Sequence, residues 1–565
     1  MINKTATVYT LSINLFFLGL CLVFGNLRFG AIDDLFMSGI LSGIYGENNV
    51  HLTFVNALYG YCLLPLYYVF PIINWYYIGE MSSIFISLTI AGYIVIRKAG
   101  EKWGPILTMA LVALCASDYY LVMQFTQCAA MLSAVGMLCI VYGFDKIEQD
   151  LRDKKKALII ISLGIVLLCW GSWMRWQAFL MGMPFFAMIL LMKARNLWNR
   201  KTLVFGTFLI LFVSVFGCRL FDQHMYNSPE YKTYIEFQGP RALLGDGQNY
   251  NQQAVYEDLD EMGYSGKDFT MLTNWTFYDN EVFAPDSIRI ITDVIDKYFF
   301  RNNLRSWPIL VFGALQKSVQ SPIFFAWMLF CFALFVLRTK KDLWVWLSLA
   351  MALSLIGYLL NLQRLVYRVE TGLWLYATIL TIPLLKERYN ISKRITVSMV
   401  VLMAMCNLCV YAISGSQVRS PNTGELVSVQ NEMVDYADYN GLQAYMDSLS
   451  DSTVFFMKMN SYMRLSRKRN PPYLAEPKGS WDRIYSFGFW TPYFPEVEKS
   501  FRRRGVSNPI KDVILDNVFV IDEPLLADFL ERHYYEKVQV DTVRNFGGMV
   551  VYKYSLVNDS LMRTK

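Results

Sequence analysis

Two adjacent carboxylates, Asp33 and Asp34, stand in the segment GAIDDLFMSGILSGIYG, directly after the first long apolar run of the chain. A carboxylate held beside a hydroxyl group can act as a general base. A second carboxylate nearby can orient that hydroxyl or bind a divalent cation through its oxygens. A structural role is the alternative, because an acidic residue at the start of a helix caps free N–H groups and suits the helix dipole.

Other polar residues lie at the ends of apolar runs, where they could line the same site. Arginine is suited to phosphate because its planar guanidinium group binds oxygens in pairs. The alternative for these arginines is to extend towards lipid head groups, and for Asp118 it is to cap a helix or to pair with Arg175. The candidates for substrate binding are His51, Asp118, Gln124, Arg175, Arg364 and Arg368.

The composition places these residues in a membrane protein. Of the 565 residues, 55% are hydrophobic and 16% are aromatic, and the mean hydropathy is +0.30. Such values are typical of chains with many membrane-spanning runs. The net charge of +6 comes from short basic clusters between these runs. Such clusters are typical of cytoplasmic loops rather than of a nucleic-acid-binding face, so membrane lipids are expected partners and nucleic acid is not.

Eleven apolar runs are long enough to cross the roughly 30 Å of hydrocarbon in a bilayer. They cover residues 8–25, 74–96, 104–120, 125–144, 157–173, 176–192, 202–220, 322–338, 342–361, 369–385 and 393–413. A further stretch, 51–71, contains Asn56, Gly60 and two prolines. We expect this stretch to be interfacial or re-entrant rather than spanning, and a twelfth element near 306–320 is an open alternative.

The basic connections set the orientation of these spans. Residues 97–102, 146–156, 193–201, 338–342 and 386–394 together hold 19 Lys and Arg residues. The positive-inside rule places them in the cytoplasm, with the N-terminus inside and the C-terminus outside. All five connections satisfy the rule only if residues 51–71 do not span. The acidic pair and the other candidate residues then lie together on the extracytoplasmic side of the plasma (inner) membrane.

Two long polar segments fall on that same side. One is the outer loop 221–305, and the other is the segment after residue 413. The second alternates STVFFMKM and NVFVID with an amphipathic EPLLADFLERHYYE and ends in KVQVDTV and GMVVYKYSL. This order predicts a small α/β domain with a closing strand pair. The fold class is therefore an α-helical polytopic membrane domain, 1–413, followed by a soluble extracytoplasmic α/β domain, 414–565.

The first outer loop, 26–73, resembles that of the C-type superfamily of integral-membrane glycosyltransferases. It opens on an acidic pair and continues through interfacial segments before the next span. The segments NLRFGAIDDLFMSGILSGIYG, QFTQCAA, TNWTFYDNEVF and RLVYRV also resemble a group of uncharacterised bacterial multispanning proteins. The resemblance implies a polyprenyl-phosphate-linked sugar as donor and a catalytic base at Asp33 or Asp34, with a slight preference for Asp33. It also implies that Arg364 and Arg368 bind the lipid phosphate.

The resulting expectation is a transferase that moves a hexose or pentose to a glycan or lipid acceptor of the cell envelope. An envelope polysaccharide polymerase or ligase, and a non-enzymatic transporter or flippase, are the alternatives. A divalent cation is a conceivable cofactor, but the second outer loop offers only Asp118 as an acidic residue. Metal dependence, the sugar and the acceptor are not set by the sequence.

Overall fold

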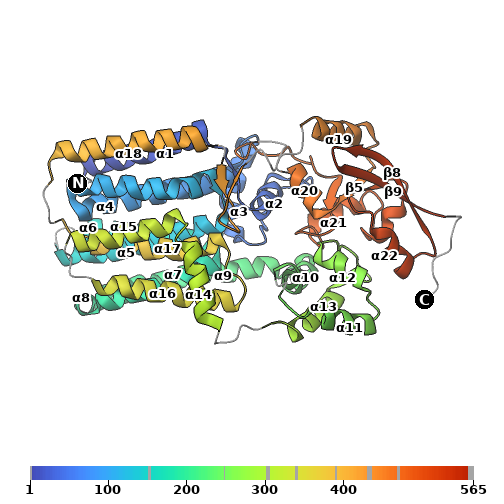
Figure 1. Cartoon of the computed structure of the whole chain (residues 1–565), viewed down its shortest axis with the longest axis horizontal. Coiled ribbons are helices and arrows are strands. Elements are labelled where there is room, and N and C mark those ends of the chain that lie inside the picture. The colour runs from blue at the N-terminus through green and yellow to red at the C-terminus, as the bar shows by residue number, and fades with distance from the viewer. Residues whose placement is uncertain are drawn as a thin grey trace.

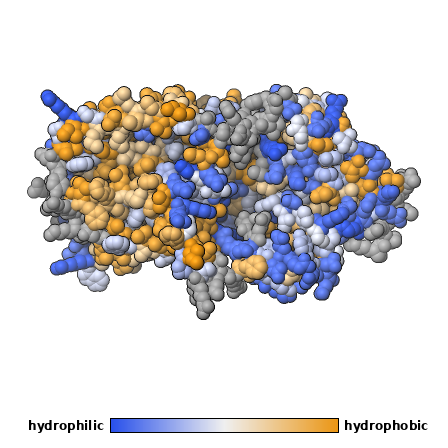
Figure 2. All heavy atoms as spheres, viewed as in Figure 1, coloured by the Kyte–Doolittle hydropathy of each residue, from blue (hydrophilic) through white to orange (hydrophobic). Residues whose placement is uncertain are grey.

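The structure of the chain is a computed structural model. It describes residues 3–149, 154–246, 249–300, 306–337, 342–387, 391–415, 417–428, 436–466 and 471–557. The molecule is elongated, with a bundle of long helices at one end and a mixed helix and sheet region at the other (Figure 1). Hydrophobic residues cover the visible face of the bundle, and hydrophilic residues dominate the other half (Figure 2).

Each predicted span overlaps a helix of the bundle, although the helices near 322–338 and 369–385 end before the predicted spans do. The helices are α1 (Lys4–Phe24), α4 (Trp75–Ala116), α5 (Phe125–Gln149), α6 (Lys154–Met174), α7 (Trp176–Met192), α9 (Lys201–Tyr226), α15 (Pro322–Val336), α16 (Asp342–Asn361), α17 (Tyr367–Ile379) and α18 (Lys393–Ser414). Within the described part of the chain, seven helices are long and apolar enough to cross a membrane, or eight if α14 (Trp307–Ser318) and α15 form one span bent by 89°. The chain is thus a multi-pass helical membrane protein, and α14 occupies the place of the twelfth element.

Helix α4 contains two of the predicted spans, because the chain reverses within it at Gly100. This residue has a φ of 84°, outside the helical range. The Thr108 hydroxyl donates a hydrogen bond of 3.3 Å to the Gly92 carbonyl oxygen. In a straight helix these two residues would lie about 24 Å apart. The segment is therefore a helical hairpin, as the separate runs 74–96 and 104–120 predicted.

The described parts of four basic connections, 97–102, 146–156, 193–201 and 386–394, meet at one end of the bundle. Lys98 and Lys193 both pair with Asp145, at N–O distances of 3.0 and 2.5 Å. A Cβ atom on Gly100 would collide with Glu387, so the connection before α18 lies at the same place. This grouping agrees with the predicted topology, while the side of the membrane stays a prediction. Residues 150–153, 338–341 and 388–390 of the five basic connections lie outside the described residues.

The first outer loop lies at the opposite end, between the bundle and the polar half (Figure 1). It forms β1 (Arg28–Phe29), α2 (Ile32–Ser42) and α3 (Ala57–Val69). Strand β1 pairs in parallel with β2 (Val122–Met123), which follows the π-helix η1 (Ser117–Leu121). Helix α3 has 13 residues with Pro65 inside it. Its length of about 20 Å is too short to span, in agreement with the interfacial prediction.

The outer loop 221–305 folds into helices with clear sequence signals. They are α10 (Pro229–Asp246), α11 (Gln252–Glu261), α12 (Gly266–Thr273) and α13 (Pro285–Lys297). The Asn251 side chain caps α11, and Ser265 forms a capping box with Asp268 at the start of α12. Helix α13 begins with a proline and buries Ile288, Ile291 and Ile295 along one face. These helices lie beside the C-terminal sheet (Figure 1).

The C-terminal sheet has five strands in the order β6-β5-β7-β9-β8. Strand β5 is parallel to both β6 and β7, and β9 is antiparallel to β7 and β8. The bounds are β5 (Val454–Met457), β6 (Ile484–Ser486), β7 (Val518–Ile521), β8 (Val538–Phe546) and β9 (Met549–Leu556). The four segments predicted as strands are confirmed, and β6 is an additional strand of three residues.

The remaining elements connect these parts. They are α8 (Ala194–Trp198), η4 (Ile382–Leu384), β3 (Gln417–Arg419), β4 (Leu426–Ser428), α19 (Tyr436–Ser448), α20 (Met459–Ser466), α21 (Pro495–Arg502), η6 (Lys511–Ile514) and α22 (Leu526–His533). The helix predicted within residues 523–536 is α22. A small α/β unit therefore follows the last bundle helix, and the boundary between 413 and 414 stays a prediction.

Candidate active site

The acidic pair lies in the first turn of α2 without capping that helix. The N-cap position is Ala31, which makes no side-chain capping hydrogen bond. Both carboxylates suit the positive end of the helix dipole, as expected. Their hydrogen bonds, however, go to other elements of the molecule. The capping role considered for Asp33 and Asp34 is thus wrong for the backbone N–H groups of α2.

Asp33 is partly open to solvent and is held by a residue from the C-terminal region. The indole N–H of Trp490 donates a hydrogen bond of 2.7 Å to Asp33 Oδ1. The charges of Arg368, Arg175 and Arg241 also act on this carboxylate. Burial raises the pKa of Asp33, while the Trp490 hydrogen bond and the three arginines oppose that rise. The site thus combines a carboxylate of raised pKa with three cations.

Asp34 is fully buried and serves as an anchor between elements. Its Oδ1 accepts hydrogen bonds of 3.1 Å from the Tyr76 hydroxyl and 3.1 Å from the backbone N–H of Phe125. Glu80, another buried carboxyl group, lies close enough to interact electrostatically with Asp34. Burial and the neighbouring charge of Asp33 raise the pKa of Asp34. Asp34 therefore connects α2 with α4 and α5, and Asp33 is the carboxylate that a substrate can reach.

Arg241 packs between two tryptophans beside this carboxylate. Its guanidinium carbon lies 3.7 Å from the centre of the Trp490 ring and 4.9 Å from that of Trp275. The side chain is fully buried. A cation over the face of an indole is attracted by the negative charge of the ring face. Sequence reasoning missed Arg241 and Trp490, because GPRALL and GFWTP look like ordinary polar-segment sequence.

Arg175 lies at the N-cap of α7, where it faces aromatic rings and a cavity. Its guanidinium carbon lies 5.0 Å from the ring centre of Phe54 and 5.3 Å from that of Phe125. The Phe54 ring in turn contacts Trp490 edge to face at 4.3 Å. The cavity has a volume of about 150 Å³ and is also lined by Arg219. This space would hold roughly ten water molecules, so it can take a polar group of substrate.

Arg364 and Arg368, both predicted to bind phosphate, have different places. Arg368 lies in the first turn of α17, close enough for its charge to act on Asp33, and it also donates a hydrogen bond to the Asn422 side chain. Arg364 precedes that helix and is exposed. Its backbone N–H donates to the Leu359 carbonyl oxygen at 2.9 Å. The structure brings Arg368 to the acidic pair, and Arg364 is not among the cations that act on Asp33.

Asp118 is buried and makes contacts other than the pairing considered for it. Its carboxylate accepts a hydrogen bond of 2.5 Å from the Tyr367 hydroxyl. It also pairs with Arg419, at an N–O distance of 3.6 Å. The alternative of a pair with Arg175 is therefore replaced by one with Arg419, and the contact ties η1 to α17 and β3.

Gln124 and His51 hold the loops around the site. The Gln124 side-chain oxygen accepts hydrogen bonds from the backbone N–H groups of Thr126 and Gln127, at 2.7 and 3.1 Å. His51 stacks on the Tyr231 ring, with 3.9 Å between the ring centres. Its Nδ1 lies 2.7 Å from the Asn49 side-chain oxygen. Substrate binding by these two residues stays a prediction.

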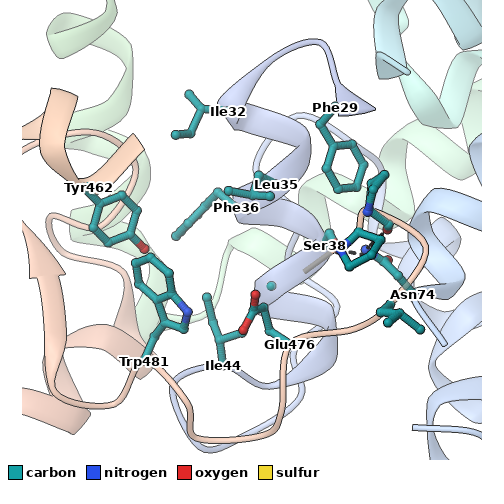
Figure 3. Close-up of a pocket in the computed structure, with 14 residues that line it drawn as sticks. Phe29, Ile32, Leu35, Phe36, Ser38, Ile44, Asn74, Tyr462, Glu476 and Trp481 are labelled. Carbon is teal, nitrogen blue, oxygen red and sulfur yellow. Dashed lines mark hydrogen bonds between the residues drawn. The ribbon is translucent and has the colours of Figure 1, made fainter. Parts of the chain in front are cut away.

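A second, smaller cavity separates the other side of α2 from the C-terminal region (Figure 3). It is lined by Ile32, Leu35 and Phe36 of α2 and by Tyr462 and Trp481 from the other side. Its volume of about 40 Å³ would hold only a few water molecules. This cavity is too small for a sugar ring, so the cavity at Arg175 is the better candidate for substrate.

The acidic groups were also considered as ligands of a metal ion. Within the part of the chain that the structure describes, no three side chains of His, Cys, Asp or Glu come together as a metal site. Asp33 and Asp34 are adjacent, but the Asp34 oxygens face Tyr76, Phe125 and Glu80. A divalent cation therefore stays a conceivable cofactor without a ligand set of its own.

Comparisons with known proteins gave matches only among solved structures. No family model and no curated protein matches the sequence. ArnT from Cupriavidus metallidurans bound to undecaprenyl phosphate is similar, with 12% identity, a TM-score of 0.41 and coverage of 98% of both chains. The Archaeoglobus fulgidus oligosaccharyltransferase in the apo form has 12% identity and a TM-score of 0.41, covering 99% of this chain and 76% of that one. At these values the similarity assigns no activity to this chain.

Proposed function

We propose that this chain is a membrane glycosyltransferase of the cell envelope, with a polyprenyl-phosphate-linked sugar as donor and a glycan or lipid as acceptor. The observation that carries the proposal is the cluster at Asp33. Trp490 donates a hydrogen bond to Asp33, Arg241 covers the Trp490 ring, and Arg175 lies over Phe54, which meets the same ring. Helix α2, which carries Asp33, lies between the helical bundle and the polar half (Figure 1). The proposed donor has matching parts in the same order. Its apolar chain suits the bundle, its phosphate suits the arginines, and its sugar suits the polar half.

The arginines suit the phosphate of such a donor. A phosphate diester carries one negative charge, and the leaving phosphate gains a second as its bond to the sugar breaks. Guanidinium groups stabilise that developing charge with paired hydrogen bonds, and they do so more strongly where water is scarce. Arg368 on α17 and Arg175 on α7 are the two candidates on bundle helices. We assign the phosphate to these two residues.

Asp33 suits the acceptor side of the reaction. In an inverting displacement, the acceptor hydroxyl oxygen forms a bond to the anomeric carbon while the bond from that carbon to the phosphate oxygen breaks. The hydroxyl proton passes to the carboxylate, and the electron pair of the broken bond leaves with the phosphate. A general base typically contributes a factor of about 10² to 10⁴ in rate. Asp33 has the partial exposure that this role requires, and Asp34 does not.

The test is sugar transfer by the purified protein in lipid nanodiscs. Polyprenyl-phosphate hexoses and pentoses are supplied with membrane glycolipid extract, with and without a chelator, and loss of the lipid-linked sugar is measured. We expect wild-type protein to consume one of these donors and Asp33→Asn to be inactive. The proposal fails if wild-type protein consumes none of them, or if Asp33→Asn matches wild type. Consumption of a lipid pyrophosphate oligosaccharide instead would indicate the polymerase or ligase alternative.

A further inference from the structure

The residue that binds Asp33 comes from the C-terminal sheet region. Trp490 follows β6, close to the carboxyl ends of the parallel strands β5, β6 and β7. In open α/β sheets this edge is where ligands are usually bound. Here the edge faces the first outer loop, since Trp490 reaches Asp33. It also meets the outer loop 221–305, because the Phe487 carbonyl oxygen accepts hydrogen bonds from the backbone N–H groups of Phe277 and Tyr278.

The backbone around Trp490 has an unusual conformation. Phe489 and Tyr493, on either side of it, have positive φ angles of 62° and 60°. Thr53, with a φ angle of 55°, precedes Phe54, which contacts the Trp490 ring. Trp275, with a φ angle of 62°, lies against Arg241, which also covers the Trp490 ring. These are four of the six non-glycine residues with positive φ in the described ranges. Such conformations are costly for residues with a side chain, and they tend to gather at functional sites.

The Trp490 ring is held on several sides. The guanidinium group of Arg241 covers one face of the ring at 3.7 Å. Phe54 meets the ring edge to face at 4.3 Å, and Phe489 contacts it at 5.8 Å. A ring fixed in this way aims its single N–H donor in one direction. That direction is Asp33 Oδ1, which leaves Oδ2 as the oxygen that can receive a proton.

We propose that Trp490 is a positioning residue of the transfer site, whose indole N–H fixes the Asp33 carboxylate with Oδ2 turned to the acceptor hydroxyl. The C-terminal region then completes the site rather than only binding acceptor. Arg241 acts through Trp490 by holding the ring. The inference rests on the proposed function, because it assumes that Asp33 is the base.

The first variant is Trp490→Phe, which keeps an aromatic ring over Arg241 and removes only the N–H donor. The other charged groups around Asp33 remain, namely Asp34 on α2, Arg175 on α7, Arg241 on α10 and Arg368 on α17. Without the N–H, the carboxylate holds a proton more readily. We therefore expect kcat to fall about tenfold at pH 6 and less than threefold at pH 8, with the acid limb moved to higher pH. The KM for the lipid donor should stay within a factor of about two.

The matched control is Trp344→Phe. Its indole N–H donates a hydrogen bond of 2.8 Å to the Thr381 hydroxyl, beyond the far end of α17 from Arg368. Loss of that buried bond should leave the pH profile unchanged. Trp490→His, which retains a ring N–H donor, should restore part of the activity at pH 6. Thermal unfolding of each variant shows whether the fold is retained.

The outcomes separate this inference from the proposed function. A wild-type protein that transfers sugar, together with a Trp490→Phe profile that is unchanged, overturns the role of Trp490 alone. An equal loss at every pH, or a matching loss in Trp344→Phe, also overturns it, because both indicate a structural effect. A wild-type protein without transfer activity overturns both. Only a pH-dependent loss confined to Trp490→Phe supports the inference.

Discussion

The two ends of the helical bundle use charged residues in different ways. At the basic end, lysines predominate, and two of them share the buried carboxylate of Asp145. At the other end, arginines lie over aromatic rings, and a carboxylate accepts a hydrogen bond from an indole. Lysine near water is strongly hydrated and contributes mainly its charge, whereas a stacked guanidinium has a fixed position. The number of basic residues at one end therefore indicates the membrane topology. The partners of the charged residues at the other end indicate where the reaction takes place.

The largest expected effect on activity comes from one carboxylate, Asp33, at the end of the bundle opposite the basic connections. Asp33→Asn should lower kcat by about a thousandfold, because an amide cannot take the proton of the acceptor hydroxyl. The initial rate of transfer from a lipid-phosphate sugar at saturating donor measures this loss. If Asp33→Asn keeps more than about a tenth of the wild-type rate, neither end of the bundle supplies the base, and the contrast between the two ends fails.

A smaller effect distinguishes the two arginines that flank the start of α17. Arg368→Ala should raise the KM for the lipid donor by about 10 to 100-fold, because a hydrogen-bonded charge partner of the phosphate is lost. Arg364→Ala is the matched control, since this exposed residue lies four positions earlier. It should change the KM by less than about threefold. Equal effects of both variants would contradict the assignment of the phosphate to Arg368.

The buried carboxyl group of Asp34 should make the stability of the fold depend on pH. The pKa of Asp34 is raised in the folded protein, so folding favours its protonated form. Stability should then decrease as the pH rises above the unfolded value of about 3.9 towards the raised folded value. Asp34→Asn keeps the oxygen that Tyr76 and Phe125 contact and removes the titration. The unfolding temperature should therefore vary less between about pH 5 and 8, the range below the raised pKa of about 8, in this variant than in wild type.

The transfer rate of Asp34→Asn should fall by less than about tenfold, since the residue positions α2 without touching substrate. The corresponding Asp33→Asn protein serves as the comparison. A loss as large as that of Asp33→Asn would indicate that the buried carboxylate itself takes part in chemistry.

The smallest effect on activity is expected at the basic end. Asp145→Asn removes the acceptor that Lys98 and Lys193 share. The two ion pairs are largely buried, so their loss should lower the free energy of unfolding, by up to about 3 to 5 kcal/mol. The transfer rate should stay within about twofold of wild type. A strong loss of activity here would remove the functional contrast between the two ends.

Much of the architecture could be predicted from the sequence because it follows from local patterns. Apolar runs gave the bundle helices, and basic connections gave their common end. Alternating apolar residues gave β5, β7, β8 and β9, whereas β6, with three residues, is too short to show a period. The interfacial reading of residues 51–71 followed from Pro65 and the loop charges together.

The site could be predicted only in part. Asp33 was identifiable because two carboxylates next to an apolar run are unusual. The sequence predicted phosphate binding equally for Arg364 and Arg368. The structure distinguishes them, because Arg368 lies in the first turn of α17 and Arg364 precedes that helix. Trp490 and Arg241 carry no local signal, because their roles arise from contacts between segments far apart in the chain. Only the fold shows that they meet Asp33.

The hydrogen bond between Trp490 and Asp33 also has a consequence for how the protein is made. Its two residues are separated by 457 positions in the chain. At a synthesis rate of about 5 to 20 residues per second, the proposed base emerges from the ribosome roughly half a minute to a minute and a half before its partner. While the bundle is inserted into the membrane, Asp33 lacks its hydrogen bond from Trp490. A nascent chain therefore holds an incomplete site until translation is nearly finished.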